Sequence, residues 1–211
     1  MILIDLLIAL GAYLLGSIPF GLLVAKARGV DIRTAGSGNI GATNAMRVLG
    51  KPAGILVLLL DALKGYAATA FLPPLLLAGL GVTTPAPGLL PLLAGICAVL
   101  GHNYTCWLKF KGGKGIATTA GVYLALAPWA VLIALVVFLL AVAATRYVSV
   151  GSIAAAVALP AAVWILKPGD LWLGLVTTAL GVLAIYKHKS NIQRLRAGTE
   201  NRLGQKAGVV K

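Results

Sequence analysis

The chain has 211 residues, of which 60% are hydrophobic and only 11% are charged, a composition that excludes an ordinary soluble domain. Its formal net charge of +13 would suggest a nucleic-acid partner in a soluble protein, but the lysines and arginines of a membrane protein collect in cytoplasmic loops and contact anionic headgroups. We therefore expect one all-α, polytopic membrane domain over residues 1–211 that binds no nucleic acid.

Long apolar stretches recur along the chain and predict its membrane spans, because a spanning helix needs roughly 20 mostly apolar residues. The first stretch, 2–24, has neither the basic n-region nor the cleavage site of a signal peptide, so we interpret it as a retained first span. The other spans are expected at 53–72, 89–108, 116–127, 129–145, 150–166 and 171–186.

The basic residues predict how these spans are oriented. All lysines and arginines except Lys64 and Lys167 fall into clusters outside the predicted spans. If every cluster is cytoplasmic, the parity of the crossings gives about seven transmembrane helices, with the N-terminus outside and the C-terminus in the cytoplasm.

The stretch 115–145 is the least regular part of this topology, because each of two legs would be shorter than a hydrocarbon core of about 30 Å. Pro128 is expected to mark the turn, and one leg is expected to be a short helix that begins inside the protein. If 115–145 is one long tilted helix instead, there are six spans and Arg146 lies outside.

The first cytoplasmic loop carries a glycine-rich motif, Ser37-Gly-Asn-Ile-Gly-Ala-Thr-Asn44, followed by Arg47. Its glycines allow backbone N–H groups to turn inward, so the motif suits a phosphate group. The spacing also matches G-x-G-x-x-G, with Asp61 where a dinucleotide fold has its acidic residue, but that motif needs a βαβ unit and we reject it. The alternative is a glycine-rich loop without a function.

The second cytoplasmic loop places Lys114 between Gly113 and Gly115 at the start of a predicted helix. This arrangement puts an ammonium group beside unpaired backbone donors, so Lys114 is a candidate for contact with an anion. The loop is not a Walker A motif, since position 108 is leucine, and Lys109 is expected only to anchor it.

Two further segments carry candidate anion ligands. Arg146, Ser149 and Ser152 lie at a junction between spans, where they complete an anion site or are ordinary interface residues. His188 and Asn191 are three residues apart, hence on one face of a continuing helix, and both can donate to an oxyanion. The alternative for His188 is a solvated or structural side chain at a helix end.

Several polar residues inside or at the ends of spans need partners. Asp61 and Lys64 are expected to form a mutually satisfied pair, with a role in ordering the site beneath the loops as the alternative. His102 and Asn103 either support the Lys114 loop or bond between helices.

The acidic residues are too few and too dispersed for a two-metal phosphotransfer site, since the chain contains only five carboxylates. The soluble acyltransferase motif H-x-x-x-x-D is also absent, because Trp107 and Gln193 stand five residues after the two histidines. We therefore expect no metal and no cofactor, and a reaction that needs little acid–base assistance.

Taken together, these motifs resemble those of the bacterial membrane acyltransferase family that transfers an acyl group from acyl phosphate to glycerol-3-phosphate. The resemblance covers nearly the full length, in the segments that begin at Ser37, Gly113 and His188. It implies direct attack of the glycerol 1-hydroxyl on the acyl carbonyl without an acyl-enzyme, giving lysophosphatidic acid and phosphate. Acyl phosphate, glycerol-3-phosphate, membrane lipid and the soluble enzyme that makes acyl phosphate are the implied partners.

The resemblance also implies roles for individual residues. Ser37, Gly38, Thr43 and Lys114 would hold the acyl-phosphate head, whereas Arg47, Lys114, Ser152, His188 and Asn191 would position glycerol-3-phosphate. The predicted catalytic residues are Ser37, Lys114 and His188, and the predicted binding residues are Gly38, Asn39, Gly41, Thr43, Asn44, Arg47, Gly113, Gly115, Arg146, Ser149, Ser152, Asn191 and Glu200. The expected location is the bacterial cytoplasmic (inner) membrane, with the site on its cytoplasmic side. A transporter for an organic phosphate and a lipid-binding scaffold are the alternative functions.

Overall fold

The computed structural model describes residues 2–82 and 89–204, and every regular element within them is a helix. The chain divides into two compact units, Met1–Leu126 and Ala127–Lys211. An all-helical architecture is what a predominantly apolar chain requires, because a helix satisfies its own backbone hydrogen bonds inside a bilayer. The expectation of a single functional domain stays a prediction.

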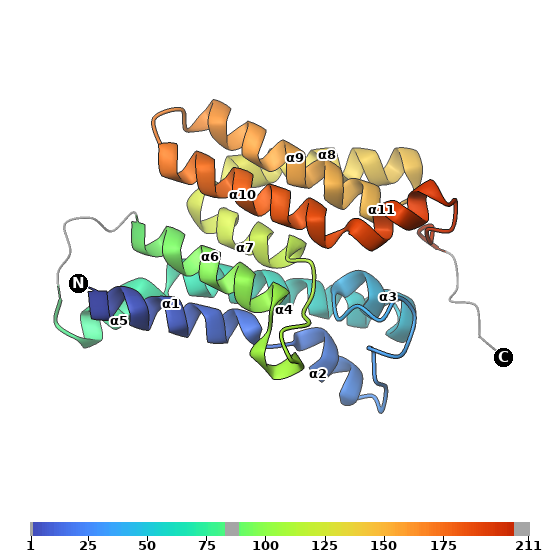
Figure 1. The fold of residues 1–211 in the computed structure, drawn as a ribbon, viewed down its shortest axis with the longest axis horizontal. Coiled ribbons are helices and arrows are strands. Elements are labelled where there is room, and N and C mark those ends of the chain that lie inside the picture. The colour runs from blue at the N-terminus through green and yellow to red at the C-terminus, as the bar shows by residue number, and fades with distance from the viewer. Residues whose placement is uncertain (1, 83–88, 205–211) are drawn as a thin grey trace. The chain divides into compact units, whose positions relative to one another are not determined.

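The first unit is built around two helix pairs (Figure 1), in which α1 packs along α6 and α4 packs along α7. Its helices are α1 (Ile2–Ser17), α2 (Phe20–Lys26), α3 (Ala42–Leu49), α4 (Lys51–Ala70), α5 (Leu72–Gly79), α6 (Leu89–Asn103), the short 3-10 helix η1 (Cys106–Leu108) and α7 (Ile116–Leu126). Cys97 in α6 and Cys106 in η1 are both free.

Glycines allow the helices of the first unit to pack with their backbones in contact. A Cβ atom on Gly16 of α1 would collide with the carbonyl of Ala98 in α6, and one on Gly121 of α7 would collide with the carbonyl of Ala62 in α4. Small residues at such crossings are typical of membrane helices, because close van der Waals packing drives their association.

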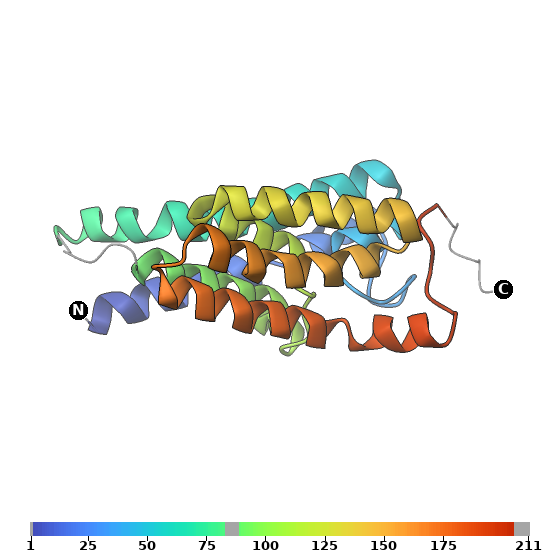
Figure 2. The same cartoon turned by 90° about the horizontal axis from the view of Figure 1, so that it is seen from above.

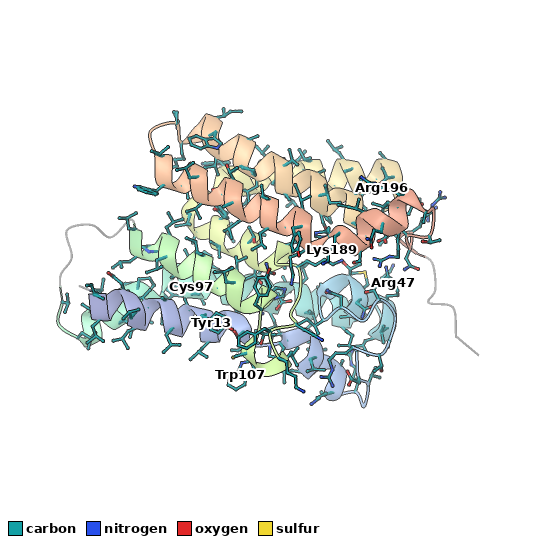
Figure 3. All side chains as sticks on the ribbon, in the orientation of Figure 1. Tyr13, Arg47, Cys97, Trp107, Lys189 and Arg196 are labelled. Atoms are coloured by element: carbon teal, nitrogen blue, oxygen red, sulfur yellow. The ribbon has the colours of Figure 1, made fainter. Side chains whose placement is uncertain are left out.

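The predicted span 2–24 is broken in the structure. Helix α1 ends at Ser17 and α2 begins at Phe20, after Pro19. Hydrogen bonds hold the end of α1 to the segment that follows α6, because Thr105 Oγ1 donates to the Ser17 carbonyl (2.7 Å) and Tyr13 Oη donates to the Tyr104 carbonyl (2.7 Å; Figure 3). Helices α1 and α2 together still form an apolar stretch long enough to cross a membrane.

The second unit consists of α8 (Pro128–Thr145), α9 (Val148–Leu166), α10 (Leu171–Lys187) and α11 (Lys189–Arg196). Helix α9 packs against both α8 and α10 (Figure 2). The turn before α10 is closed by Asp170, whose carboxylate accepts a hydrogen bond from the Leu173 N–H (3.0 Å) and so caps the helix.

A helix break lies where the sequence predicted it. Ala127, with φ −151° and ψ 70°, separates α7 from α8, so a single continuous helix over 115–145 is wrong. Helix α7 has only 11 residues, which corresponds to a rise of roughly 16 Å at about 1.5 Å per residue. It is the short helix expected in this stretch.

Several described helices are long and apolar enough to cross a membrane. Within residues 2–82 and 89–204 there are 5 such helices, or 6 if α10 and α11, bent by 52° relative to each other, count as one span. Helix α7 is apolar but too short for this count. The all-α prediction is therefore confirmed for residues 2–82 and 89–204, whereas the predicted seven spans stay a prediction.

Candidate functional site

A single buried side chain, Asn44, organises the first loop. Its amide group donates to the carbonyls of Asn39 (2.8 Å), Ala35 (3.0 Å) and Ile32 (3.3 Å). Its Oδ1 accepts a hydrogen bond from the backbone N–H of Ser37 (2.8 Å). Both ends of the Asn44 amide are therefore engaged within the loop, so this predicted binding residue shapes the site from inside the protein.

Three other residues of the motif lie on the surface of this loop. Ser37, Gly38 and Thr43 are exposed, whereas Arg47 in α3 is half-buried (Figure 3). Gly36 and Gly38 have φ values of 60° and 69°, in the left-handed region that a residue with a side chain rarely adopts. The glycines thus permit the tight course of the loop around Asn44.

Replacing Asn44 with aspartate should destabilise the first unit, because aspartate keeps the acceptor for the Ser37 N–H but cannot donate to the three carbonyls. Buried acceptors that lose their partner cost roughly 1–3 kcal/mol each, so we expect a clear fall in the thermal unfolding temperature in detergent. The matched control is Asn39→Asp, since Asn39 accepts the Gly41 N–H through Oδ1 (2.8 Å), as aspartate can. Equal stability of the two variants would contradict the assigned role of Asn44.

The loop that carries Lys114 rests on the end of α6. The backbone N–H groups of Gly112 and Gly113 donate to the carbonyls of Asn103 (3.2 Å) and His102 (3.0 Å). A Cβ atom on Gly113 would collide with the His102 imidazole, so ring and loop are in direct contact. The prediction that His102 and Asn103 support this loop is confirmed, and Lys114 itself is half-buried.

A buried ion pair lies deeper in the first unit, in α4. Lys64 Nζ is 2.8 Å from Asp61 Oδ1, and the two side chains are 2% and 3% exposed. The expected pairing of Asp61 with Lys64 is confirmed, and two further contacts were not predicted. Lys64 also donates to the Ile18 carbonyl (2.8 Å), and His102 Nδ1 lies 3.6 Å from Asp61 Oδ1.

The first two loops share one hydrophobic cluster. Ile32 and Ile40 of the first loop are buried in it with Leu22 and Ala45, and Leu108, just before the Lys114 loop, packs against the same cluster. Two segments that are far apart in the sequence are thereby held on one part of the first unit.

In the second unit, the Glu200 carboxylate is the centre of the third motif. It accepts hydrogen bonds from Asn191 Nδ2 (2.8 Å) and from Arg194 Nε (2.7 Å), and only Asn191 was predicted as part of the site. Burial alone would raise the pKa of Glu200, but the hydrogen bonds from Asn191 and Arg194 and the positive charge of Arg194 outweigh it and lower the pKa below its ordinary value. Glu200 thus fixes Asn191 in place.

The lowered pKa of Glu200 predicts a pH-dependent contribution to stability. A depressed folded-state pKa gives stability that is complete above the ordinary value of 4.5 and is lost as the pH falls through the lower folded value. Wild type should therefore unfold at a higher temperature than Glu200→Gln at neutral pH, and the difference should shrink below pH 4.5. Unfolding temperatures of both proteins across this range measure the effect, and a difference independent of pH would refute the assignment.

The His188 ring contacts the backbone of its own helix. Its Nδ1 lies 2.7 Å from the carbonyl of Ala184, one turn earlier in α10. Because a carbonyl only accepts, Nδ1 carries the proton, and a neutral ring then has its lone pair on Nε2. Nε2 of neutral His188 is consequently a hydrogen-bond acceptor, whereas the sequence had suggested a donor.

Arg146 and Ser152 are engaged within the second unit. Arg146 Nη2 donates to the Leu203 carbonyl (3.3 Å), and the Arg146 carbonyl accepts the Leu203 N–H (2.7 Å). Ser152 Oγ donates to the Val148 carbonyl (2.9 Å), which leaves its oxygen able to accept. The tail is thus fastened to the α8–α9 junction.

The predicted site residues divide between the two units. The structure groups those of the first and second motifs in the first unit, from Ser37 to Gly115, and those of the third motif with the α8–α9 junction in the second unit, from Arg146 to Glu200. That both groups act at one site stays a prediction.

Comparison with known proteins gives a consistent answer. The family model described as glycerol-3-phosphate acyltransferase matches residues 6–198. Glycerol-3-phosphate acyltransferases from Geobacter metallireducens and Geobacter sulfurreducens are 56% and 50% identical, over 95% and 94% of this chain and 98% and 97% of their own. The crystal structure of PlsY (YgiH), an integral membrane glycerol 3-phosphate acyltransferase, in its glycerol 3-phosphate form superposes with a TM-score of 0.83 at 39% identity, covering 95% of this chain and 96% of that one. Its lysophosphatidic acid form superposes with a TM-score of 0.81 at 38% identity, covering 95% of both chains.

Proposed function

The chain belongs to the glycerol-3-phosphate acyltransferase family, and from this premise we propose that it transfers an acyl group from acyl phosphate to the 1-hydroxyl of glycerol-3-phosphate. The products are lysophosphatidic acid and inorganic phosphate. The observation that carries the proposal is the pair of anion-suited loops, one containing Ser37 and the other Lys114. Ile40 of the first loop and Leu108, directly before the second, belong to one hydrophobic cluster.

Acyl phosphate suits this set of residues as the donor. It is a mixed anhydride whose leaving group is phosphate, so it needs groups that neutralise charge more than it needs a strong base. The one carboxylate of the first loop, Asp31, is paired with Arg33 (2.7 Å), and that hydrogen bond lowers its pKa to about 2. Its negative charge is therefore offset next to the phosphate-binding motif.

The first unit supplies the groups for the acyl-phosphate head in this proposal. Ser37 and Thr43 donate through their hydroxyl groups, and Lys114 neutralises the leaving phosphate. Gly38 shapes the loop beside Ser37, because its own N–H donates to the Ala35 carbonyl (3.0 Å). Asn39, Gly41, Asn44, Gly113 and Gly115 give the two loops their shape. The acyl tail lies among the spanning helices, since only the phosphate head needs polar surroundings.

Five side chains position glycerol-3-phosphate in this proposal. Arg47 and Lys114 bind its phosphate, and Ser152, His188 and Asn191 orient it for attack. Arg146, Ser149 and Glu200 act through the third motif, with Glu200 holding Asn191 in place. We propose residues 1–211 as one functional domain.

The transfer is a direct displacement at the acyl carbonyl. The glycerol 1-hydroxyl forms the new ester bond while the bond between the carbonyl carbon and the phosphate oxygen breaks, without an acyl-enzyme. A phosphate group of the substrates takes the hydroxyl proton, and Nε2 of His188 accepts a hydrogen bond that orients this hydroxyl. No metal and no cofactor takes part.

The proposed topology places the reaction at the cytoplasmic face of the bacterial inner membrane. Seven crossings that include the short α7 put the N-terminus outside and the C-terminus in the cytoplasm. Acyl phosphate comes from the soluble enzyme that makes it, and lysophosphatidic acid enters the lipid leaflet directly.

Product analysis with the purified protein tests this proposal. Palmitoyl phosphate and glycerol-3-phosphate should yield 1-palmitoyl lysophosphatidic acid, detected by mass spectrometry, together with an equal amount of phosphate. The same protein in sealed vesicles should not accumulate labelled glycerol-3-phosphate. Uptake without product formation would indicate a transporter instead, and an absence of both would favour a lipid-binding scaffold.

A further inference from the structure

We propose that Lys64, Asp61 and His102 form a positioning network that fixes the loop carrying Lys114. His102 links the buried ion pair of α4 to this loop. The inference rests on the proposed acyl transfer and assigns no substrate contact to any of the three residues.

The ion pair makes more contacts than mutual neutralisation requires. Charged side chains inside a membrane span need a partner, and Asp61 and Lys64 provide one for each other at 2.8 Å. Lys64 Nζ also donates to the Ile18 carbonyl (2.8 Å) at the break between α1 and α2, and it lies 5.6 Å from the centre of the Phe20 ring. The pair therefore holds a defined position in the first unit.

His102 contacts both the ion pair and the loop. Its Nδ1 lies 3.6 Å from Asp61 Oδ1, and its carbonyl accepts the hydrogen bond from the Gly113 N–H (3.0 Å). The three atoms nearest to a Cβ placed on Gly113 all belong to the His102 imidazole. The ring thus lies between Asp61 and the residue that precedes Lys114.

The other side of the loop is fixed to the same turn of α4. Helix α7 begins at Ile116, and a Cβ atom on Gly65 would collide with the carbonyl of Thr118 in its first turn. Gly65 directly follows Lys64 in α4. The residues on both sides of Lys114 are therefore attached to residues 61–65 of α4. Gly113 is attached through His102, and Thr118 touches Gly65 directly.

This double attachment determines how accurately the Lys114 ammonium group is placed. A misplacement of about 1 Å costs roughly 100-fold in the rate of a reaction that depends on alignment. Loss of the network should hence lower kcat, while the KM for glycerol-3-phosphate changes less because the first loop and Arg47 keep their own supports.

An uncharged replacement of the ion pair separates positioning from a merely structural role. In Asp61→Leu/Lys64→Met both charges disappear together, and apolar residues that replace a buried pair are often neutral or stabilising. We expect an unfolding temperature at or above that of wild type, with kcat lower by roughly 10- to 100-fold and a smaller rise in the KM for glycerol-3-phosphate, whose phosphate Lys114 also binds in the proposed function. A folded double variant with wild-type kcat would overturn the inference.

A double-mutant cycle between His102 and Gly113 tests the contact itself and remains decisive if the ion-pair variant does not fold. Gly113→Ala and His102→Ala should each lower kcat by roughly 10-fold or more. The kcat of the double variant should not fall below that of the less active single variant, because without the imidazole the methyl group added at position 113 has nothing to collide with. Effects that multiply would show that ring and loop act independently. His102→Asn should recover part of the lost kcat, since it retains a donor towards Asp61.

Two controls distinguish this inference from the proposed function. Thr69→Val removes a buried hydroxyl of α4 that bonds only to the Gly65 carbonyl of its own helix (2.9 Å), and it should keep wild-type kcat. Wild-type protein without acyl transfer would refute the proposed function itself. If wild type and Thr69→Val are both active and the network variants also keep the wild-type kcat, only the positioning network is refuted.

Discussion

Replacing Lys114 with alanine is expected to lower glycerol-3-phosphate-dependent phosphate release by about 10²- to 10³-fold, the effect of removing one preorganised donor at a developing charge. The loop should keep its course, because its backbone bonds to His102 and Asn103 do not involve the lysine side chain. The loss should hence appear in kcat, measured as phosphate released from palmitoyl phosphate, and the unfolding temperature should stay close to that of wild type.

Two variants provide the matched controls for this result. Lys111→Ala removes an exposed lysine three positions earlier and should retain near wild-type activity. Lys114→Arg keeps the positive charge but replaces the compact ammonium group with a planar guanidinium group. Its activity should therefore lie between those of Lys114→Ala and wild type. An active Lys114→Ala protein, or equal losses at Lys111 and Lys114, would remove the assigned role of Lys114.

The second large effect is expected at His188, where the two amide replacements should differ. Asparagine can still donate to the Ala184 carbonyl as Nδ1 does, but it offers nothing at the position of Nε2. Glutamine reaches the position of Nε2. If Nε2 orients the glycerol hydroxyl, His188→Asn should lose about 10²-fold in kcat and His188→Gln roughly tenfold.

The pH–rate profile decides whether His188 also takes the proton. With a substrate phosphate as the proton acceptor, the acid limb of the profile should persist in His188→Gln. The exposed Lys189→Gln variant, one residue further on, should behave as wild type in both respects. Disappearance of the acid limb in His188→Gln would make the imidazole the base.

The helices of this protein follow from its sequence more readily than their breaks do. Apolar stretches of sufficient length predicted the spans, since lipid leaves the chain little choice of conformation. The break between α1 and α2 was missed although Pro19 lies within it, because proline inside a membrane helix is often tolerated when neighbours satisfy the freed carbonyls. At this break Lys64, far along the chain, donates to the Ile18 carbonyl, which the sequence could not indicate.

In the site, too, local features could be predicted from the sequence, whereas contacts between distant residues could not. Glycine spacing around Ser37 and Lys114 marked both loops, because it reflects a local backbone requirement. The hydrogen-bond partners of Asn44 and Glu200 could not be predicted, because the partners of a buried polar group depend on how the whole chain folds. Arg194 was not predicted as a site residue, because in the sequence it is one of several basic residues of the tail.

The most direct test of the proposed reaction follows phosphate release over time after palmitoyl phosphate is added to the purified protein. The account predicts no release until glycerol-3-phosphate is present, and then one phosphate for each lysophosphatidic acid formed. A burst of phosphate from palmitoyl phosphate alone would reveal an acyl-enzyme and contradict direct attack. Product formed with the acyl thioester of acyl carrier protein as the only donor would contradict the assigned acyl-phosphate donor.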